Sequence, residues 1–311
     1  MKTTVIGPGA MGLLFAARLA AAGSDGVTVR LLDHRPGRAK ALTQKGILFE
    51  GPEGPDQVYV EVSSDPAILA QTDLALVCTK AYDTAAVAAT LAEHLPPEAR
   101  ALTLQNGAGN LEILVKHLGA GRVLAGITSE GATLLGPGHV RHAGRGQTHL
   151  GQAAGAPDGF TFQVADLLAA AGFSVEVFDR VQDLIWTKLA INAGINALTA
   201  LLQVPNGALL DLPSAGALLE AAVAETVAVG QSLGVHFLHS DMLLATQEVA
   251  RRTAANRSSM AQDVAARRRT EVDFINGAVW RMAQEKGLPA PANAHLTLLV
   301  KATEESFSLP D

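Results

Sequence analysis

Short apolar segments alternate with helical patterns along the first half of the chain. The segments that read as buried strands cover residues 2–7, 27–32, 58–62, 74–78, 101–104 and 123–127. Between several of them, apolar residues recur at helical spacing, over residues 13–22, 84–94 and 111–118. This alternation predicts an α/β fold: a doubly wound, mostly parallel sheet with helices on both faces.

The pattern changes twice in the second half. Residues 133–151 are rich in glycine and alternate in polarity, which predicts antiparallel strands that close the sheet. After a last strand at 175–178 the chain is almost wholly helical, apart from a break at 202–213, and one long helical pattern runs from about 258 through 277. We therefore expect a Rossmann-type domain over residues 1–178 and an all-α C-terminal domain over residues 179–311.

One predicted helix carries polar residues on an apolar face. Lys188, Asn192 and Asn196 follow one another at four-residue intervals among Leu and Ile side chains. In a helix each step of four residues turns the side chain by only about 40°, so the three form one stripe on a face expected to be buried. A buried ammonium needs polar partners or loses its proton. The stripe is therefore a candidate for proton transfer.

Composition and charge narrow the class of protein. The 311 residues are 48% hydrophobic and 17% charged, which is typical of a globular protein with a large interior. A net charge of −6 argues against general nucleic-acid binding. No uninterrupted apolar run approaches the roughly 20 residues of a membrane span, there is no signal-peptide pattern, and the single cysteine, Cys78, fits a reducing compartment. We expect a soluble cytoplasmic protein with no membrane partner.

The first strand leads into a glycine motif that favours a dinucleotide. Gly7, Gly9 and Gly12 form Gly-x-Gly-x-x-Gly between that strand and a helix, with Ala10 and Met11 in the first helical turn. The first glycine allows the tight turn, the second lets a pyrophosphate approach the backbone, and the third allows close packing of helix on strand. The N–H groups of the helix N-terminus then face the phosphates.

The residues after the second strand leave the identity of the dinucleotide open. Asp33 fits the acidic residue that accepts the ribose hydroxyls of NAD. His34, Arg35 and Arg38 follow at once, and an arginine here can hold the 2′-phosphate of NADP. Lys80 adds another positive charge after the strand at 74–78, although a solvated surface explains these basic residues too.

At three further places the sequence also fits an ordinary structural role. Asn106 follows the strand at 101–104, at the sheet edge where ligands bind, but a simple Asn-Gly turn also explains it. Ser258 or Ser259 fits a helix cap. Glu271 follows the basic run at 267–269, which favours a surface ion-pair network.

The nine histidines show no metal-ligand spacing, so no metal site is expected. His34, His139, His142 and His149 fit surface or loop positions.

Taken in order, the motifs resemble those of the ketopantoate reductase family (2-dehydropantoate 2-reductases) over essentially the whole chain. The matching motifs are residues 7–12, Thr79-Lys80, Gln105-Asn106-Gly107, Arg141-His142-Ala143-Gly144, Trp186-x-Lys188-Leu189-x-x-Asn192, Ser258-Ser259-Met260-x-Gln262-Asp263 and residues 269–277.

The resemblance implies a role for each polar position. Lys188 would be the general acid that protonates the carbonyl oxygen, and Glu271 would hydrogen-bond the nascent hydroxyl and help to keep the lysine charged. Asn106 would bridge cofactor and substrate. The other substrate-binding residues would be Asn192, Asn196, Asn256 and Ser259. The residues that hold NADP would be Gly7, Gly9, Ala10, Met11, Gly12, Asp33, His34, Arg35, Lys80 and Asn106.

The chain departs from the family pattern at two places. Members that use NADPH carry a basic residue at the end of the second strand, where this chain has Asp33, so NAD is an alternative cofactor. Glu130 stands where a histidine is common, and its role is not assigned.

The resemblance leads us to expect an NADP-dependent oxidoreductase, a 2-dehydropantoate 2-reductase that transfers hydride from NADPH to the C2 carbonyl of ketopantoate. The product, pantoate, serves pantothenate and coenzyme A biosynthesis. An NADH-dependent reductase of another 2-keto acid, a D-2-hydroxyacid dehydrogenase, is the first alternative. A non-catalytic dinucleotide-binding sensor is the second, although a sensor has no need for a proton donor. The expected partner is a small 2-keto acid, and the Ala-rich helices are compatible with a homodimer.

Overall fold

The computed structural model describes residues 1–23, 26–51 and 54–309, and the chain forms two compact units. The first comprises Met1–Gln105 and Asn110–Val181, and the second comprises Asn106–Gly109 and Gln182–Asp311. The main boundary thus falls after Val181, whereas the sequence placed it after residue 178. The short segment Asn106–Gly109 belongs to the second unit although it follows a strand of the first.

The first unit is built on an eight-stranded sheet in the order β12-β11-β8-β7-β6-β1-β2-β5. Its strands are β1 (Lys2–Ile6), β2 (Thr28–Leu32), β5 (Glu61–Ser63), β6 (Leu74–Val77), β7 (Arg100–Thr103), β8 (Val123–Thr128), β11 (Gln147–Gln152) and β12 (Ser174–Val177). All pairs are parallel except β8 with β11. The strand order reverses beside β1, which pairs with β2 on one side and β6 on the other. Such a reversal is where open α/β sheets bind ligands.

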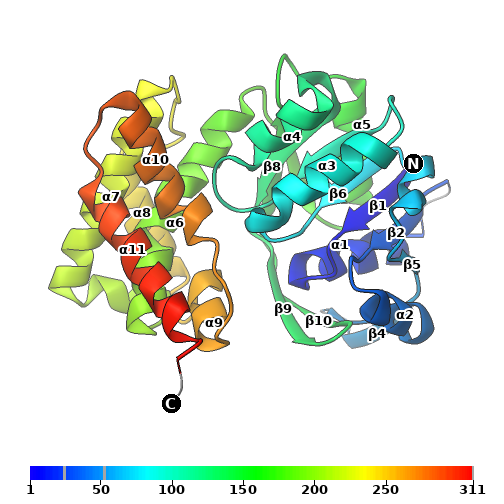
Figure 1. The fold of residues 1–311 in the computed structure, drawn as a ribbon, viewed down its shortest axis with the longest axis horizontal. Coiled ribbons are helices and arrows are strands. Elements are labelled where there is room, and N and C mark those ends of the chain that lie inside the picture. The colour runs from blue at the N-terminus through cyan, green and yellow to red at the C-terminus, as the bar shows by residue number, and fades with distance from the viewer. Residues whose placement is uncertain (24–25, 52–53, 310–311) are drawn as a thin grey trace. The chain divides into compact units, whose positions relative to one another are not determined.

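Helices connect the parallel strands, as the alternating pattern predicts. They are α1 (Ala10–Ala21), α2 (Pro36–Lys45), α3 (Thr84–His94), α4 (Asn110–Leu118) and α5 (Gly159–Ala170), with 3₁₀ turns η1 (Pro66–Gln71), η2 (Ala81–Asp83) and η3 (Ala120–Arg122). The helices α3 and α4 lie side by side (Figure 1), whereas α1 packs with α5. Every residue of β6 is buried, because a parallel strand covered on both faces must be apolar throughout. The predicted α/β fold is confirmed.

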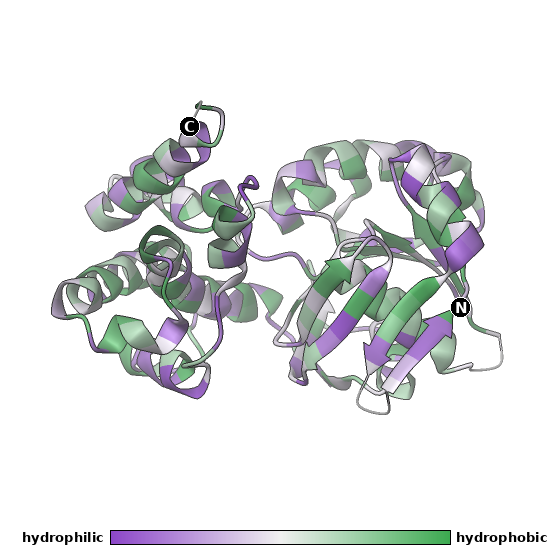
Figure 2. Ribbon diagram, turned by 90° about the horizontal axis from the view of Figure 1, so that it is seen from below, coloured by the Kyte–Doolittle hydropathy of each residue, from purple (hydrophilic) through white to green (hydrophobic). Residues whose placement is uncertain are grey.

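A second, four-stranded sheet packs against α1 in the order β4-β3-β10-β9. Its strands are β3 (Ile47–Gly51), β4 (Gly54–Val58), β9 (Gly131–Gly136) and β10 (His139–Gly144). Hydrophilic and hydrophobic residues alternate along strands of the first unit in Figure 2, as in a sheet with one buried face. The predicted single strand at 58–62 is wrong. The chain divides there because Val58 pairs with β3, whereas Glu61–Ser63 pairs with β2 in the larger sheet.

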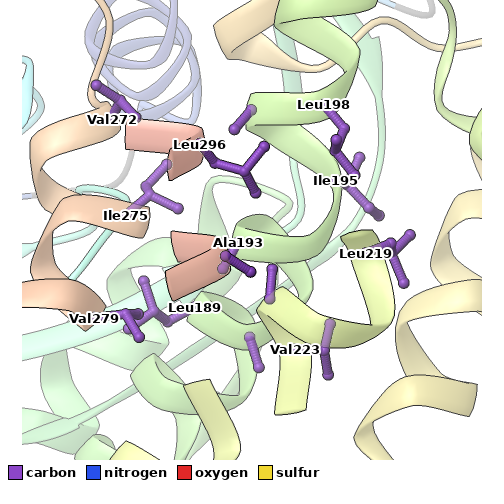
Figure 3. Close-up of a cluster of buried hydrophobic side chains, with 14 of the residues drawn as sticks. Leu189, Ala193, Ile195, Leu198, Leu219, Val223, Val272, Ile275, Val279 and Leu296 are labelled. Carbon is purple, nitrogen blue, oxygen red and sulfur yellow. The ribbon is translucent and has the colours of Figure 1, made fainter. Parts of the chain in front are cut away.

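The second unit is helical around the central helix α6 (Val181–Leu202). Around it lie α7 (Pro213–Ser232), α8 (Met242–Arg252), α9 (Ser259–Ala265), α10 (Asn276–Lys286) and α11 (Pro291–Ser306), with 3₁₀ turns η4 (Asn206–Leu210) and η5 (Val272–Phe274). Figure 3 shows apolar side chains of α6 among those of neighbouring helices. The labelled ones are Leu189, Ala193, Ile195, Leu198, Leu219, Val223, Val272, Ile275, Val279 and Leu296.

By length and composition α6 would suffice to cross a membrane. The sequence did not suggest this, because the helix contains no long uninterrupted apolar run. However, 72% of its most apolar window is buried inside the protein. A core helix of a large helical unit is apolar on most of its faces for the same reason as a membrane helix. Its hydropathy is therefore explained by burial in the second unit.

The predicted long helix from 258 through 277 is wrong. The helix α9 ends at Ala265, and Arg267 adopts a left-handed backbone conformation with φ 51°. The Arg267 N–H donates to the Val264 carbonyl and the Arg268 N–H to the Asp263 carbonyl, so the last turn is closed by backbone hydrogen bonds. The chain resumes as the turn η5 and then as α10. Glu271 therefore lies in a turn between helices.

Candidate active site

The glycine loop of the first unit has the stereochemistry that each glycine was predicted to need. Gly7 has φ +94°, and a Cβ there would lie 2.7 Å from the Thr79 side chain. A Cβ on Gly12 would lie 1.9 Å from the Gly7 carbonyl oxygen, so α1 approaches the loop as closely as it can. Around the Cβ position of Gly9, by contrast, nothing among the described residues lies within 4 Å.

The open space at Gly9 fits a bound pyrophosphate. Gly9 precedes Ala10 at the start of α1, with Met11 next in the same turn, and no described side chain caps this N-terminus. The first N–H groups of a helix lack intrahelical partners and carry partial positive charge, so phosphate oxygens are suitable acceptors for them. The residues present thus fit a dinucleotide at the end of β1.

Asp33 follows β2 and is completely buried, with an exposed fraction of 0%. Arg38, in the first turns of α2, donates from Nε to Asp33 Oδ2 at 2.5 Å and from Nη2 to Oδ1 at 2.7 Å. The backbone N–H of Arg35 donates to Oδ1 at 3.0 Å. The side chains of His34 and Arg35 are exposed. The acidic residue is therefore bonded within the protein, and the basic ones beside it face outward.

The loops after β6 and β7 are joined by Gln105. Its amide donates to the Thr79 carbonyl at 3.0 Å and to the Thr84 hydroxyl at 2.9 Å. Lys80 is half-buried in the first of these loops, directly before η2. The neighbouring Cys78 is a poor nucleophile, because burial raises the pKa of its thiol to about 12. Gln105 thus holds the two loop starts at the same edge of the sheet.

The Asn106–Gly109 segment packs on the turn that follows Glu271. The Ala108 N–H donates to the Phe274 carbonyl at 2.8 Å. Gly107 has φ +91°, and a Cβ there would lie 2.3 Å from the same carbonyl oxygen. Glycine is thus required both by the backbone conformation and by the close approach. Asn106 is half-buried at the start of this segment.

The polar stripe of the second unit lies on α6 as predicted. Lys188 and Asn192 are half-buried, and Asn196 is buried. Burial lowers the pKa of Lys188 to about 8, and the nearby Glu271 carboxylate opposes this shift. The lysine is thus poised to exchange its proton near neutral pH.

Glu271 is buried, with an exposed fraction of 7%, so its interpretation as part of a surface ion-pair network is wrong. The turn is anchored on both sides of it: the hydroxyl and N–H of Thr270 donate to Glu304 at 2.5 and 2.7 Å, and Val272 is buried. Other residues form the ion pairs near this turn, among them Arg269 with Asp273 at 3.8 Å and Arg268 with Asp263 at 3.0 Å. The basic run at 267–269 had suggested an exposed Glu271, but it precedes a turn that faces inward.

Asn256 and Ser259 differ from the stripe in being exposed. Between them, Ser258 is buried and caps α9 by accepting from the Ala261 N–H at 3.0 Å. The Ser258 hydroxyl also pairs with Thr199 Oγ1 at 2.8 Å, one turn of α6 beyond Asn196. The cap is therefore Ser258, and it fastens the loop that carries Asn256 and Ser259 to α6.

Two family models match nearly the whole chain. "Ketopantoate reductase PanE/ApbA" matches residues 3–155, and "Ketopantoate reductase PanE/ApbA C terminal" matches residues 180–304. The chain belongs to the ketopantoate reductase family.

Individual relatives within this family span the same length. A 2-dehydropantoate 2-reductase of Halobacterium salinarum is 40% identical over 98% of this chain and 99% of its own. The crystal structure of a ketopantoate reductase from Ralstonia eutropha JMP134 is similar with a TM-score of 0.91 and 35% identity, over 99% of this chain and 100% of that one. A D-mandelate dehydrogenase in complex with NADH and anilino(oxo)acetate is similar with a TM-score of 0.90 and 25% identity, over 99% and 100% of the two chains.

A buried pair formed by Glu130, to which the sequence assigned no role, was missed from the sequence. Glu130 Oε2 lies 2.5 Å from His142 Nε2, and each side chain is 2% exposed. The expectation that His142 is a surface or loop residue is wrong, and His139 and His149 also lie on strands. The alternation along β10 was an available signal, because it places His142 on the same face as the buried Val140. Within the described part of the chain, no three metal-ligating side chains converge.

Proposed function

We propose that the protein is an NADPH-dependent 2-dehydropantoate 2-reductase, which reduces the C2 carbonyl of ketopantoate to give pantoate. The observation that carries this proposal is Lys188, a half-buried lysine with a pKa of about 8 and the Glu271 carboxylate nearby. The full-length similarity to 2-dehydropantoate 2-reductases supports the choice of substrate.

In this reaction the bound nicotinamide supplies a hydride to the carbonyl carbon. Lys188 Nζ donates its proton to the carbonyl oxygen, where negative charge develops as the carbon is reduced. An ammonium beside that oxygen stabilises the transition state more than the ground state, which is the condition for raising kcat. A pKa of about 8 keeps the lysine mostly protonated at pH 7 and yet a competent acid.

Glu271 keeps Lys188 charged against the effect of burial and accepts a hydrogen bond from the new hydroxyl group. The remaining polar side chains, Asn106, Asn192, Asn196, Asn256 and Ser259, supply donors for the carboxylate and hydroxyl of the substrate. We assign them to substrate binding because amides and hydroxyls bind carboxylates without changing charge.

For the cofactor we propose NADPH, held by the glycine loop, His34, Arg35 and Lys80. Its 2′-phosphate would meet the exposed basic residues after β2 rather than an exposed carboxylate, because Asp33 is buried. An arginine can bind a phosphate through two parallel hydrogen bonds.

The decisive test is the turnover of ketopantoate by Lys188→Ala. We expect kcat to fall by about 10²–10⁴, the usual contribution of a general acid. Lys286→Ala is the matched control, since it removes an exposed lysine at the end of α10 in the same unit. Unchanged kcat in Lys188→Ala, with the fold intact by circular dichroism, would remove the proton-donor role.

The similarity to D-mandelate dehydrogenase favours one alternative, an NADH-dependent reductase of another 2-keto acid. Comparing kcat/KM for ketopantoate and phenylglyoxylate, each with NADPH and with NADH, separates the two proposals. Ketopantoate with NADPH should be the best pair by at least tenfold, and a preference for phenylglyoxylate with NADH would select the alternative.

We further propose a cytoplasmic homodimer. Leu298 and Leu299 on α11 are more than half exposed, at 52% and 55%, and would be covered by a partner helix face. Light scattering of the purified protein measures the stoichiometry, and a monomeric mass would rule the dimer out.

A further inference from the structure

Donors of its own chain already occupy most acceptor positions of the Asp33 carboxylate. It receives two hydrogen bonds from the Arg38 guanidinium, at 2.5 and 2.7 Å, and one from the Arg35 backbone at 3.0 Å. Its exposed fraction is 0%, whereas 30% of the Arg38 side chain is exposed. A carboxylate in this position ordinarily accepts the ribose hydroxyls of NAD and repels the 2′-phosphate of NADP. Here the carboxylate has little capacity left to accept the ribose hydroxyls. The positive charge of Arg38 offsets its repulsion of a 2′-phosphate.

The basic residues beside the pair remain directed outward. The His34 side chain is 71% exposed, and Arg35 Nε lies 3.3 Å from His34 Nε2 on the surface. The planar guanidinium of Arg35 suits a bidentate contact with a phosphate. The Arg38 guanidinium, by contrast, has Nε and Nη2 committed to Asp33.

We propose that Arg38 determines the cofactor specificity of this protein by masking Asp33. The proposal rests on the assignment of NADPH made above and adds its physical cause. Arg38 is a positioning residue: it holds the carboxylate inward and neutralises it, so that Arg35 meets a 2′-phosphate without a competing negative charge. A chain with Asp33 but without Arg38 would present the acidic group that selects NAD.

The test measures binding of two nucleotide fragments that lack the nicotinamide, 2′,5′-ADP and 5′-ADP, by isothermal titration calorimetry on the full-length protein. The quantity compared is the ratio of the two dissociation constants. We expect the wild type to prefer 2′,5′-ADP. Arg38→Met should shift the ratio toward 5′-ADP by about tenfold or more, which is the size of one lost favourable contact.

A second pair of variants separates masking from direct phosphate binding. In the Asp33→Asn background there is no charge to mask, so adding Arg38→Met should leave the ratio within about threefold, which is less than a single lost contact. An equal effect of Arg38→Met with and without Asp33→Asn would mean that Arg38 binds the phosphate itself, and would overturn the proposal.

Two controls complete the design. Arg30→Met removes an arginine of the neighbouring strand β2, which pairs with Glu61 at 2.9 Å, and should leave the ratio unchanged. Arg38→Lys keeps the charge but loses the two-point contact, and should shift the ratio in the same direction by less, so the proposal stays testable if Arg38→Met does not fold. A wild type that prefers 5′-ADP would contradict NADPH as cofactor. The masking by Arg38 is tested independently, by the change in ratio between the variants.

Discussion

At the scale of single residues, Lys188 shows how burial and charge together set reactivity. Removal from water disfavours the ammonium and a nearby carboxylate favours it, so the pKa stops at about 8 rather than falling further. Neither burial nor the carboxylate alone would give a lysine that is both charged at pH 7 and acidic enough to donate its proton.

A falling limb in the pH profile is expected from this lysine. With Lys188 as the proposed proton donor, its protonated form would be the active one, so kcat/KM for ketopantoate should be level below pH 8 and fall about tenfold per pH unit above it. Glu271→Gln removes the charge that raises the pKa, and the limb should therefore move to lower pH. A limb that stays in place in Glu271→Gln would show that Glu271 does not control the lysine.

The Glu130–His142 pair predicts a strong effect on stability. Glu130→Ala would leave the buried Nε2 of His142 without its hydrogen-bond partner, and we expect the first unit to lose about 1–3 kcal/mol, the cost of leaving one buried polar group unsatisfied. Amide hydrogen exchange of β9 and β10 resolves this unit from the other. Arg141→Ala, on the same strand but with its side chain 53% exposed, should have a much smaller effect. Equal effects of the two variants would contradict the importance of burial.

At the scale of elements, the three glycines of the loop from Gly7 to Gly12 are needed for different reasons. Gly7 and Gly12 are required by the fold, because a Cβ at either position meets protein atoms at 2.7 or 1.9 Å. Gly9 lies in extended backbone with open space beside it, so any requirement for glycine there comes from a ligand.

Substitution by alanine should distinguish a glycine required by the fold from one required by the bound nucleotide. Gly9→Ala should keep the melting temperature of the wild type and weaken NADPH binding, measured by nucleotide fluorescence, by tenfold or more, about one lost contact. Gly12→Ala should lower the melting temperature as well, because α1 cannot keep its position. Wild-type affinity in Gly9→Ala would show that the phosphates do not approach this backbone.

The turn before α10 is the element that sequence periodicity described least well. The sequence predicted one helix through this region, but the left-handed Arg267 and the anchoring of Thr270 by Glu304 interrupt it. A partner 34 residues away along the chain decides the path here. The neighbouring basic run favoured a surface position for Glu271, but this long-range contact directs the turn inward.

At the scale of the whole molecule, the chain divides into two units and passes between them more than once. The segment Asn106–Gly109 continues from β7 of the first unit and packs within the second, on Phe274. Its conformation depends on Gly107, whose φ is +91°. Nucleotide binding is proposed for the first unit and proton donation for the second, so turnover needs both.

Gly107→Ala should therefore disturb more than its own turn. The added methyl group would meet the Phe274 carbonyl at 2.3 Å in a backbone conformation that alanine disfavours, and we expect a loss of about 1–3 kcal/mol from strain of this kind. Ketopantoate turnover should fall with it, since both Asn106 and the turn after Glu271 would shift. Gly37→Ala, in α2 with nothing described within 4 Å, is the control and should change neither property. Normal turnover in Gly107→Ala would show that the conformation of the Asn106–Gly109 segment is not needed for activity.

The sequence alone determined the features that depend on neighbours a few residues apart. These are the alternation of strands and helices, the glycine loop, and the stripe of Lys188, Asn192 and Asn196 on one helix, since periodicity and backbone stereochemistry are local properties. Only the tertiary structure decided which charges are exposed and which are paired. Asp33 is masked by Arg38, Glu271 turns inward, and His142 meets Glu130, because burial and pairing depend on where the chain places distant residues and no local pattern encodes that placement.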